Sequence, residues 1–290
     1  MYDLVSVTDR QVLPEDSRVL REAALRGSVY IHWPDDRPWL EQIEGIGDPL
    51  RRLQGMKKRG SLAPIARGRW IVMPPGASTV SQAAPPPILL AALLDGRAEW
   101  YLGFLSALID HGLADIDSET LYVAVRGRGI PSTLTAGGRT VRVVRLVRAD
   151  DWAGVERLRA QGRIFTYRSD IERTLLDTLD HPKMCGPAEV WVRAWGRAAS
   201  EERLDVGRLF DYVEQRNAAV QARCAYWLRE LGQTRSARRI MHALGGRMTG
   251  ARPLDASRSF GEGPWPRDRE TGLVLNMPQE TIDGWLEYGK

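Results

Sequence analysis

A proline-rich segment divides the chain into two unequal parts. Residues 74–87, PPGASTVSQAAPPP, hold five prolines. Because proline lacks a backbone N–H and restricts the residue before it, a long helix or a central strand cannot continue through this segment. The composition therefore predicts a semi-rigid linker at a domain boundary. We expect a first domain at residues 1–76, a linker at 77–87 and a second domain at 88–290.

The end of the first part is strongly basic. Residues 51–69 hold seven basic side chains and no acidic one. Asp48 is a favoured N-cap and Gly60 a favoured stop, which predicts a helix between them. This helix places Leu53 and Met56 on one face and its cations on the other. The exposed face would then be a basic surface.

A hairpin with a basic tip follows this helix. Strands are predicted at 62–65 and 69–73, after a helix at 14–26, a strand at 29–32 and a helix at 38–44. This order is that of a winged helix-turn-helix, whose last helix and hairpin meet DNA. A solvated basic face without a partner is the alternative. We predict that the DNA-binding residues are Arg51, Arg52, Lys57, Lys58, Arg59, Arg67 and Arg69.

The second part alternates helical and extended patterns before becoming helical. The predicted fold class is α+β: an N-terminal winged helix-turn-helix domain, then a larger mixed α/β domain with a helical C-terminal half. His111 is expected to end a helix as a partner of its dipole. The expected helices are 88–95, 100–111, a helix capped by Asp170, 187–199, 203–214, 217–231, 235–245 and a piece around Trp285, with strands at 121–125, 139–148, 164–167 and 273–276.

Two groups of carboxylates are candidates for a catalytic site. Asp177 and Asp180 share a helical face next to His181, but no further ligand stands at metal spacing, which favours capping and packing. Asp115 and Asp117 form an Asp-x-Asp in a predicted loop, without the Gly-Ser turn of nucleotidyltransferases. We therefore expect no enzyme, no catalytic residue, no metal and no cofactor. The alternative is a DNA-targeted nuclease or nucleotidyl or phosphoryl transferase, which requires all four aspartates to converge in one cleft.

Composition excludes several other classes of protein. With 43% hydrophobic and 27% charged residues the chain is typical of a globular protein, and a net charge of +4 makes the position of the charge more informative than its sum. Two distant cysteines indicate no disulfide framework. The first residues lack a signal-peptide pattern, and the longest apolar run, 88–94, is too short to span a membrane. We expect a cytoplasmic location and no membrane partner.

Three segments of the chain resemble the AbiEi-type antitoxins of bacterial type IV toxin–antitoxin operons. The first is the basic helix and hairpin, RRLQGMKKRGSLAPIARGRWIVMPPG, and the second is YLGFLSALIDHGLAD. The third and most specific is IERTLLDTLDHPKMCG, which is similar to the Glu-Arg-Thr-Leu-Leu-Asp pattern of that family. The resemblance covers about residues 45–190. The family's motif falls on Glu172, Arg173, Asp177 and Asp180, among others.

This resemblance implies an autoregulatory repressor. Its winged helix would bind inverted repeats in double-stranded operator DNA, and its C-terminal domain would counteract a co-encoded nucleotidyltransferase-like toxin, with direct contact between the two left open. Trp70 stands where the family often has tyrosine, and Cys185-Gly186-Pro187 replaces a common Gly-Gly. Because the motif offers an arginine with acidic neighbours, we expect Arg173 to form a buried ion pair with a structural role.

Overall fold

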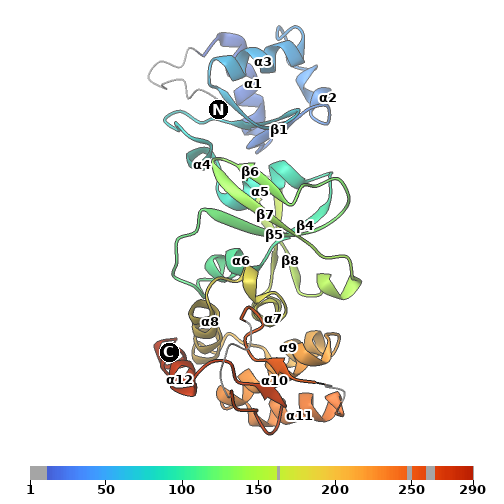
Figure 1. The fold of residues 1–290 in the computed structure, drawn as a ribbon. Helices are drawn as coiled ribbons and strands as arrows, with labels where there is room; N and C mark the ends of the chain where they lie inside the picture. The colour runs from blue at the N-terminus through green and yellow to red at the C-terminus, as the bar shows by residue number, and fades with distance from the viewer. Residues whose placement is uncertain (1–11, 162–163, 247–249, 259–264, 290) are drawn as a thin grey trace.

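The fold is a stack of three parts along one long axis, as the computed structural model in Figure 1 shows. It describes residues 12–161, 164–246, 250–258 and 265–289. A small N-terminal part, called the head here (residues 12–76), lies at one end. A six-stranded sheet lies in the middle, and a group of helices forms the other end. The predicted mixture of helices and strands is confirmed, with the helical half at the C-terminus.

The head combines helices with a small antiparallel sheet of order β1-β3-β2. Its core consists of apolar side chains from all of these elements, including Val19, Ile31, Leu40, Leu53 and Met56, none of which is exposed. The elements are α1 (Pro14–Leu25), β1 (Tyr30–His32), α2 (Arg37–Leu40), α3 (Pro49–Lys58), β2 (Leu62–Ala66) and β3 (Arg69–Val72).

The proline-rich segment is packed rather than extended between two parts. It contains a short helix, α4 (Val80–Ala83), which begins with a capping box between Thr79 and Gln82. Ala77 and Ala84 are buried in one apolar core with residues from the end of the head and from the central sheet. The prolines do interrupt regular structure, but the core continues across the predicted boundary.

The central sheet is mixed, with strand order β6-β7-β5-β4-β9-β8. The pairs β5–β7 and β4–β9 are parallel, and the other neighbours are antiparallel. Two helices accompany it, α5 (Pro86–Leu94) and α6 (Phe104–Asp110). The strands are β4 (Glu99–Leu102), β5 (Thr120–Arg126), β6 (Thr133–Ala136), β7 (Arg139–Arg145), β8 (Val155–Gln161) and β9 (Ile164–Ser169).

The helix predicted at 100–111 is wrong in its first half. Its apolar start forms β4, which pairs with β5 and β9, and the chain turns at Gly103 before α6 begins. Phe104 has a positive φ of 58° at this turn, a backbone conformation that side chains other than glycine rarely adopt. A short apolar run fits a strand or a helix, and here strand pairing decides. Strands β6 and β8 were not predicted.

The C-terminal part agrees closely with the predicted helices. Asp170 caps α7 (Ile171–Asp180) by accepting a hydrogen bond from the Arg173 N–H, as expected. The core around α7 holds three large indoles, Trp191, Trp195 and Trp227, each at most 1% exposed. The other elements are α8 (Ala188–Ser200), α9 (Val206–Val213), α10 (Ala218–Glu230), α11 (Thr234–Leu244), β10 (Arg252–Pro253), β11 (Leu273–Val274) and α12 (Gln279–Tyr288).

Within the described ranges, no helix has both the length and the apolar character needed to cross a membrane.

Candidate nucleic-acid interface

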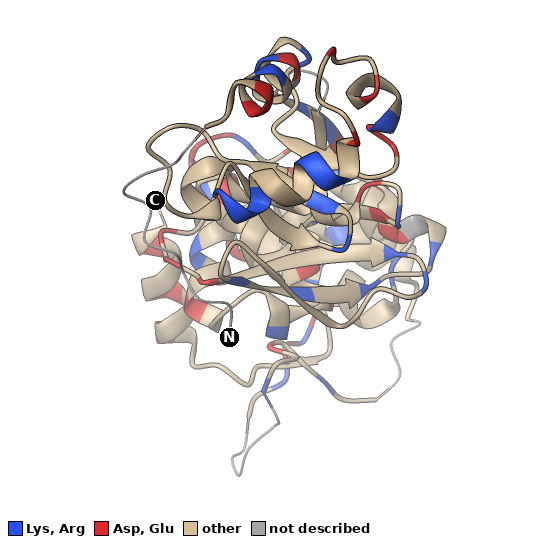
Figure 2. Cartoon of the chain, turned by 90° about the horizontal axis from the view of Figure 1, so that it is seen from above, with Lys and Arg blue, Asp and Glu red and all other residues tan. Residues whose placement is uncertain are grey.

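Helix α3 presents a polar face at the outer end of the molecule. The Asp48 carboxylate caps it by accepting hydrogen bonds from the N–H groups of Leu50 and Arg51 at 2.9 and 3.3 Å. Leu53 and Met56 are fully buried in the core of the head, as their spacing predicts. The opposite face of α3 is therefore directed to solvent. Figure 2 shows the backbone of the chain from above, with its basic residues in blue and its acidic residues in red.

Four of the seven predicted DNA-binding residues are exposed. They are Arg51, Lys57 and Lys58 on α3 and Arg67 in the turn between β2 and β3. Among the described residues, none of the four forms an ion pair with a carboxylate. Their charges are therefore available to an external anion. We call these four residues the outer cations.

Two further predicted residues, Arg52 and Arg59, are turned toward helix α1. Arg59 donates two hydrogen bonds of 2.8 Å to the carboxylate of Asp16, which is fully buried. Arg52 lies 3.6 Å from the same carboxylate and 3.8 Å from that of Glu15. Both guanidinium groups thus tie α3 to α1. The structure gives both residues a structural role, and the bidentate pair of Arg59 uses two of its five N–H donors. Their predicted contact with DNA stays a prediction.

Gly55 lies directly under the side chain of Arg59. In the structure the Arg59 guanidinium lies over this position, and a Cβ on Gly55 would stand 3.1 Å from two of its nitrogens. The missing side chain therefore makes room for Arg59, and through Arg59 for the contact with Asp16.

Arg69 is not part of an exposed surface, and its predicted contact with DNA is wrong. The residue is 3% exposed and extends from β3 toward helix α5. Its guanidinium donates hydrogen bonds of 2.7 Å to the carbonyl oxygens of Ala92 and Asp95. Burial lowers the pKa of Arg69 from its ordinary value. Through these two hydrogen bonds, Arg69 anchors the head to the central part.

Tyr30 adds a second contact between the head and α5. Its hydroxyl donates a hydrogen bond of 3.2 Å to the Asp95 carboxylate, which also accepts one of 2.8 Å from the Trp100 indole N–H. Burial raises the pKa of Asp95. The head is therefore held by side chains from two of its strands.

A polar hollow of about 400 Å³ lies along one side of α3. It is lined by Arg51, Arg52, Arg59 and Gly55, with the turn that precedes the helix as its other wall. Arg51 is the exposed cation at this hollow. The outer cations and this hollow together form the candidate interface.

The motif in α7 forms a buried polar network. Arg173 is fully buried and donates hydrogen bonds to the Asp177 carboxylate at 2.8 Å, to the Asp151 carbonyl at 2.7 Å and to the Tyr101 hydroxyl at 3.0 Å. The predicted buried ion pair of Arg173 is confirmed. Burial raises the pKa of Asp177, although the charge of Arg173 opposes this. Arg173 therefore joins α7 to the short helix η1 (Ala149–Trp152) and to β4.

Glu172 and Asp180 lie on other sides of the same helix. The Glu172 carboxylate accepts a hydrogen bond of 2.7 Å from the N–H of Asp205, the N-cap of α9, and burial raises its pKa. Asp180 lies 3.7 Å from Arg216, whose guanidinium binds the carboxylate of Asp151 at 2.6 Å. Both residues connect helices, which is the structural role expected of the motif.

The four aspartates that an enzyme would need have separate surroundings. Asp177 is buried with Arg173, whereas Asp115 is exposed and pairs with Arg197 at 2.6 Å. Asp117 lies in the loop before β5 and is exposed. Across the part of the chain that the structure describes, no three His, Cys, Asp or Glu side chains are grouped as a metal site.

A smaller expectation concerns His111 at the end of α6. His111 does end α6, and its Nε2–H donates a hydrogen bond of 2.7 Å to the Ser169 carbonyl, while burial lowers its pKa. A neutral imidazole at this place is a weak partner for the helix dipole.

Comparison with known proteins shows the fold of the whole chain. No family model matches the chain, and no curated protein matches it. It is similar to the crystal structure of the RV2827C protein from Mycobacterium tuberculosis, with a TM-score of 0.70 and 22% sequence identity. The match covers 97% of each chain. The two proteins therefore share head, sheet and helical part in one arrangement.

Proposed function

We propose that this chain is a DNA-binding antitoxin and autoregulatory repressor of the AbiEi type. The observation that carries the DNA-binding part is the position of the outer cations. They are exposed, lack acidic partners among the described residues, and belong to α3 and to the hairpin turn at one end of the molecule. The order of the head's elements, α1-β1-α2-α3-β2-β3, is that of a winged helix-turn-helix, in which these two elements meet DNA.

In this proposal α3 enters the major groove of operator DNA. Arg51, Lys57 and Lys58 contact base edges or phosphates, and Arg67 contacts the backbone beside the hairpin. Arg52 and Arg59 hold α3 at a set angle to α1. The C-terminal part, with its Glu-Arg-Thr motif, serves the antitoxin activity, and the buried network of Arg173 supports that part without taking part in chemistry.

The test of DNA binding uses labelled double-stranded DNA from the region upstream of the chain's own gene. The variant combines Arg51→Glu, Lys58→Glu and Arg67→Glu. A matched control combines Arg235→Glu, Arg238→Glu and Arg252→Glu, which changes the charge equally at exposed residues of the opposite end. The proposal expects the first variant to lose binding and the control to keep it, with native circular dichroism for both. Equal losses in the two variants would refute the assignment.

The antitoxin part has a separate test. The chain is expressed together with the nucleotidyltransferase-like protein encoded beside its gene, and bacterial growth is measured with and without it. Restored growth supports the proposal, and the outer-cation variant should restore growth as well, because repression and neutralisation are assigned to different parts. Continued growth arrest in the presence of the folded chain contradicts the antitoxin assignment.

A further inference from the structure

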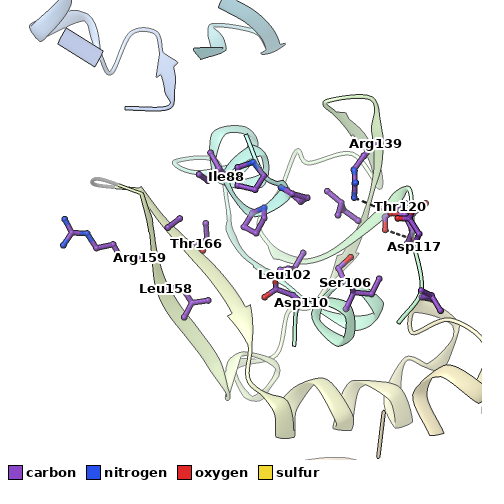
Figure 3. Close-up of a pocket in the computed structure, with 18 residues that line it drawn as sticks. Ile88, Leu102, Ser106, Asp110, Asp117, Thr120, Arg139, Leu158, Arg159 and Thr166 are labelled. Atoms are coloured by element: carbon purple, nitrogen blue, oxygen red, sulfur yellow. Dashed lines mark hydrogen bonds between the residues drawn. The ribbon is translucent and has the colours of Figure 1, made fainter. Parts of the chain in front are cut away.

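A second hollow lies between the central sheet and its helices, away from the candidate DNA interface. It measures about 540 Å³, within the range of small-molecule sites. Figure 3 shows it with Leu102, Thr166 and Leu158 along one wall and Ser106 and Asp110 below. The N-terminal end of α5, residues 85–88, forms another wall. We call this space the sheet cavity.

The apolar wall of the sheet cavity follows from the register of four strands. Thr166 on β9 is paired with Leu158 on β8, and side chains paired across antiparallel strands share a face. Leu102 on β4 is paired with Arg168 on β9. Arg168 lies two residues after Thr166, so Leu102, Arg168 and Thr166 are on the same face of the sheet. Leu121 on β5 also lines the cavity. A continuous apolar surface therefore extends across the middle of the sheet.

Two polar groups at the cavity lack strong partners. Thr166 is 4% exposed, and its hydroxyl has no hydrogen-bond partner within the described ranges. Arg139, at the other end, is half-buried, and among the described residues its guanidinium has no carboxylate partner. Its one hydrogen bond goes to the Ser118 carbonyl at a long 3.5 Å. The sheet cavity is thus lined by a hydroxyl, that of Thr166, and a guanidinium, that of Arg139, which lack strong partners among the described residues.

The remaining charges at the cavity restrict the kind of ligand. Asp110 is neutralised by Arg168 at 2.6 Å, and Asp117 is an exposed carboxylate near the end where Arg139 lies. Arg159 contributes a further exposed guanidinium at the opposite rim. Because Asp110 is already paired with Arg168, and Arg139 has no carboxylate partner among the described residues, the lining favours a ligand with a single negative charge. The nearby carboxylate of Asp117 disfavours a multiply charged anion such as a nucleotide.

We propose that the sheet cavity binds a small amphipathic monoanion, whose apolar body lies on the strands and whose carboxylate or sulfonate pairs with Arg139. The Thr166 hydroxyl is left to hydrogen-bond a polar atom of the body. The wall formed by α5 belongs to the same helix whose carbonyl at Ala92 holds Arg69. A bound molecule therefore contacts the helix that anchors the head. Binding of this anion to the sheet cavity does not require that the chain bind DNA or a toxin.

The test compares two fluorescent probes with the purified full chain. Anilinonaphthalene sulfonate carries the anion, and phenylnaphthylamine is its neutral counterpart. We expect saturable binding of the sulfonate, displaced by decanoate but not by decanol. Arg139→Gln should weaken sulfonate binding roughly ten- to hundredfold and leave the neutral probe unchanged, since one charge-assisted hydrogen-bonded pair is removed. Leu158→Trp, at the edge strand, should fill the cavity and abolish binding of both probes.

Arg142→Gln is the matched control, because Arg142 lies on the same strand as Arg139, is exposed and does not line the cavity. Its affinities should equal those of the unmodified chain. Circular dichroism and the unfolding midpoint of each variant exclude binding to misfolded protein. The proposal is overturned by an absence of saturable sulfonate binding, by equal weakening in Arg139→Gln and Arg142→Gln, or by unchanged binding in Leu158→Trp.

Discussion

Two arginines of the hairpin, Arg67 and Arg69, differ sharply in their surroundings and provide a critical test. Arg67 is exposed in the turn, whereas Arg69 is 3% exposed and binds two carbonyl oxygens. The perturbations are Arg67→Gln and Arg69→Met, each of which removes one positive charge. We expect the first to change DNA binding and the second to change stability.

The magnitudes follow from these contacts. A hydrogen bond from a charged donor contributes about 1.5–3 kcal/mol, so the loss of both bonds in Arg69→Met should lower the free energy of unfolding by about 3–6 kcal/mol. Arg67→Gln should change it by less than about 0.5 kcal/mol, because an exposed side chain without partners is replaced. One phosphate contact contributes about 0.9 to the slope of log affinity against log salt concentration, so only Arg67→Gln should reduce that slope.

The assays are urea denaturation, followed by tryptophan fluorescence, and fluorescence anisotropy with operator DNA at several salt concentrations. The slope, rather than the affinity, distinguishes the loss of a DNA contact from a loss of stability. A smaller fraction of folded protein lowers the apparent affinity by the same factor at every salt concentration and leaves the slope unchanged. Arg69→Lys is a useful companion, since it keeps the charge but cannot donate to both carbonyls in the same planar geometry. A reduced slope in Arg69→Met together with an unchanged slope in Arg67→Gln would contradict the roles assigned to both residues.

Three further predictions concern buried polar contacts outside the hairpin. Asp16→Asn should lower the free energy of unfolding by about 3 kcal/mol in urea denaturation, because it leaves cations of α3 without their buried partner; no change would show that the pair is dispensable. Arg173→Met should cost about 3–5 kcal/mol, and adding Asp177→Asn should restore part of it, which a double-mutant cycle measures. Since burial lowers the pKa of His111, the unfolded chain takes up a proton before the folded chain does. The stabilisation that comes from the neutral His111 is therefore complete above about pH 6.5 and is lost as the pH falls toward the folded-state pKa. The free energy of unfolding, measured by denaturation at neutral and at acidic pH, should therefore differ less in His111→Gln than in the unmodified chain.

Local features of the chain were predictable wherever neighbours in sequence decide them. The inward face of α3 follows from the spacing of Leu53 and Met56, and the start of α7 follows from Asp170 as an N-cap. The long helices of the C-terminal part were also identified. In each case the contacts that stabilise the element lie within a few residues, so periodicity and capping residues carry enough information.

Elements that depend on distant partners were predicted poorly. The residues that form β4 were assigned to a helix because a short apolar run has no decisive period, and its pairing with β9 joins segments more than sixty residues apart. The edge strands β6 and β8 were missed for the same reason. Neither strand is recognisable without the neighbour that provides its hydrogen bonds.

From the sequence alone, the chain can be predicted to have a basic helix and hairpin, a proline-rich segment at residues 74–87 and a helical C-terminal half. Which cations of the head face outward depends on contacts between residues far apart in the chain. Arg59 is drawn inward by Asp16, which lies 43 residues earlier, and Arg69 by carbonyls 23 and 26 residues later. The physical reason is that a buried charge requires a partner, and the fold alone determines which distant group supplies it.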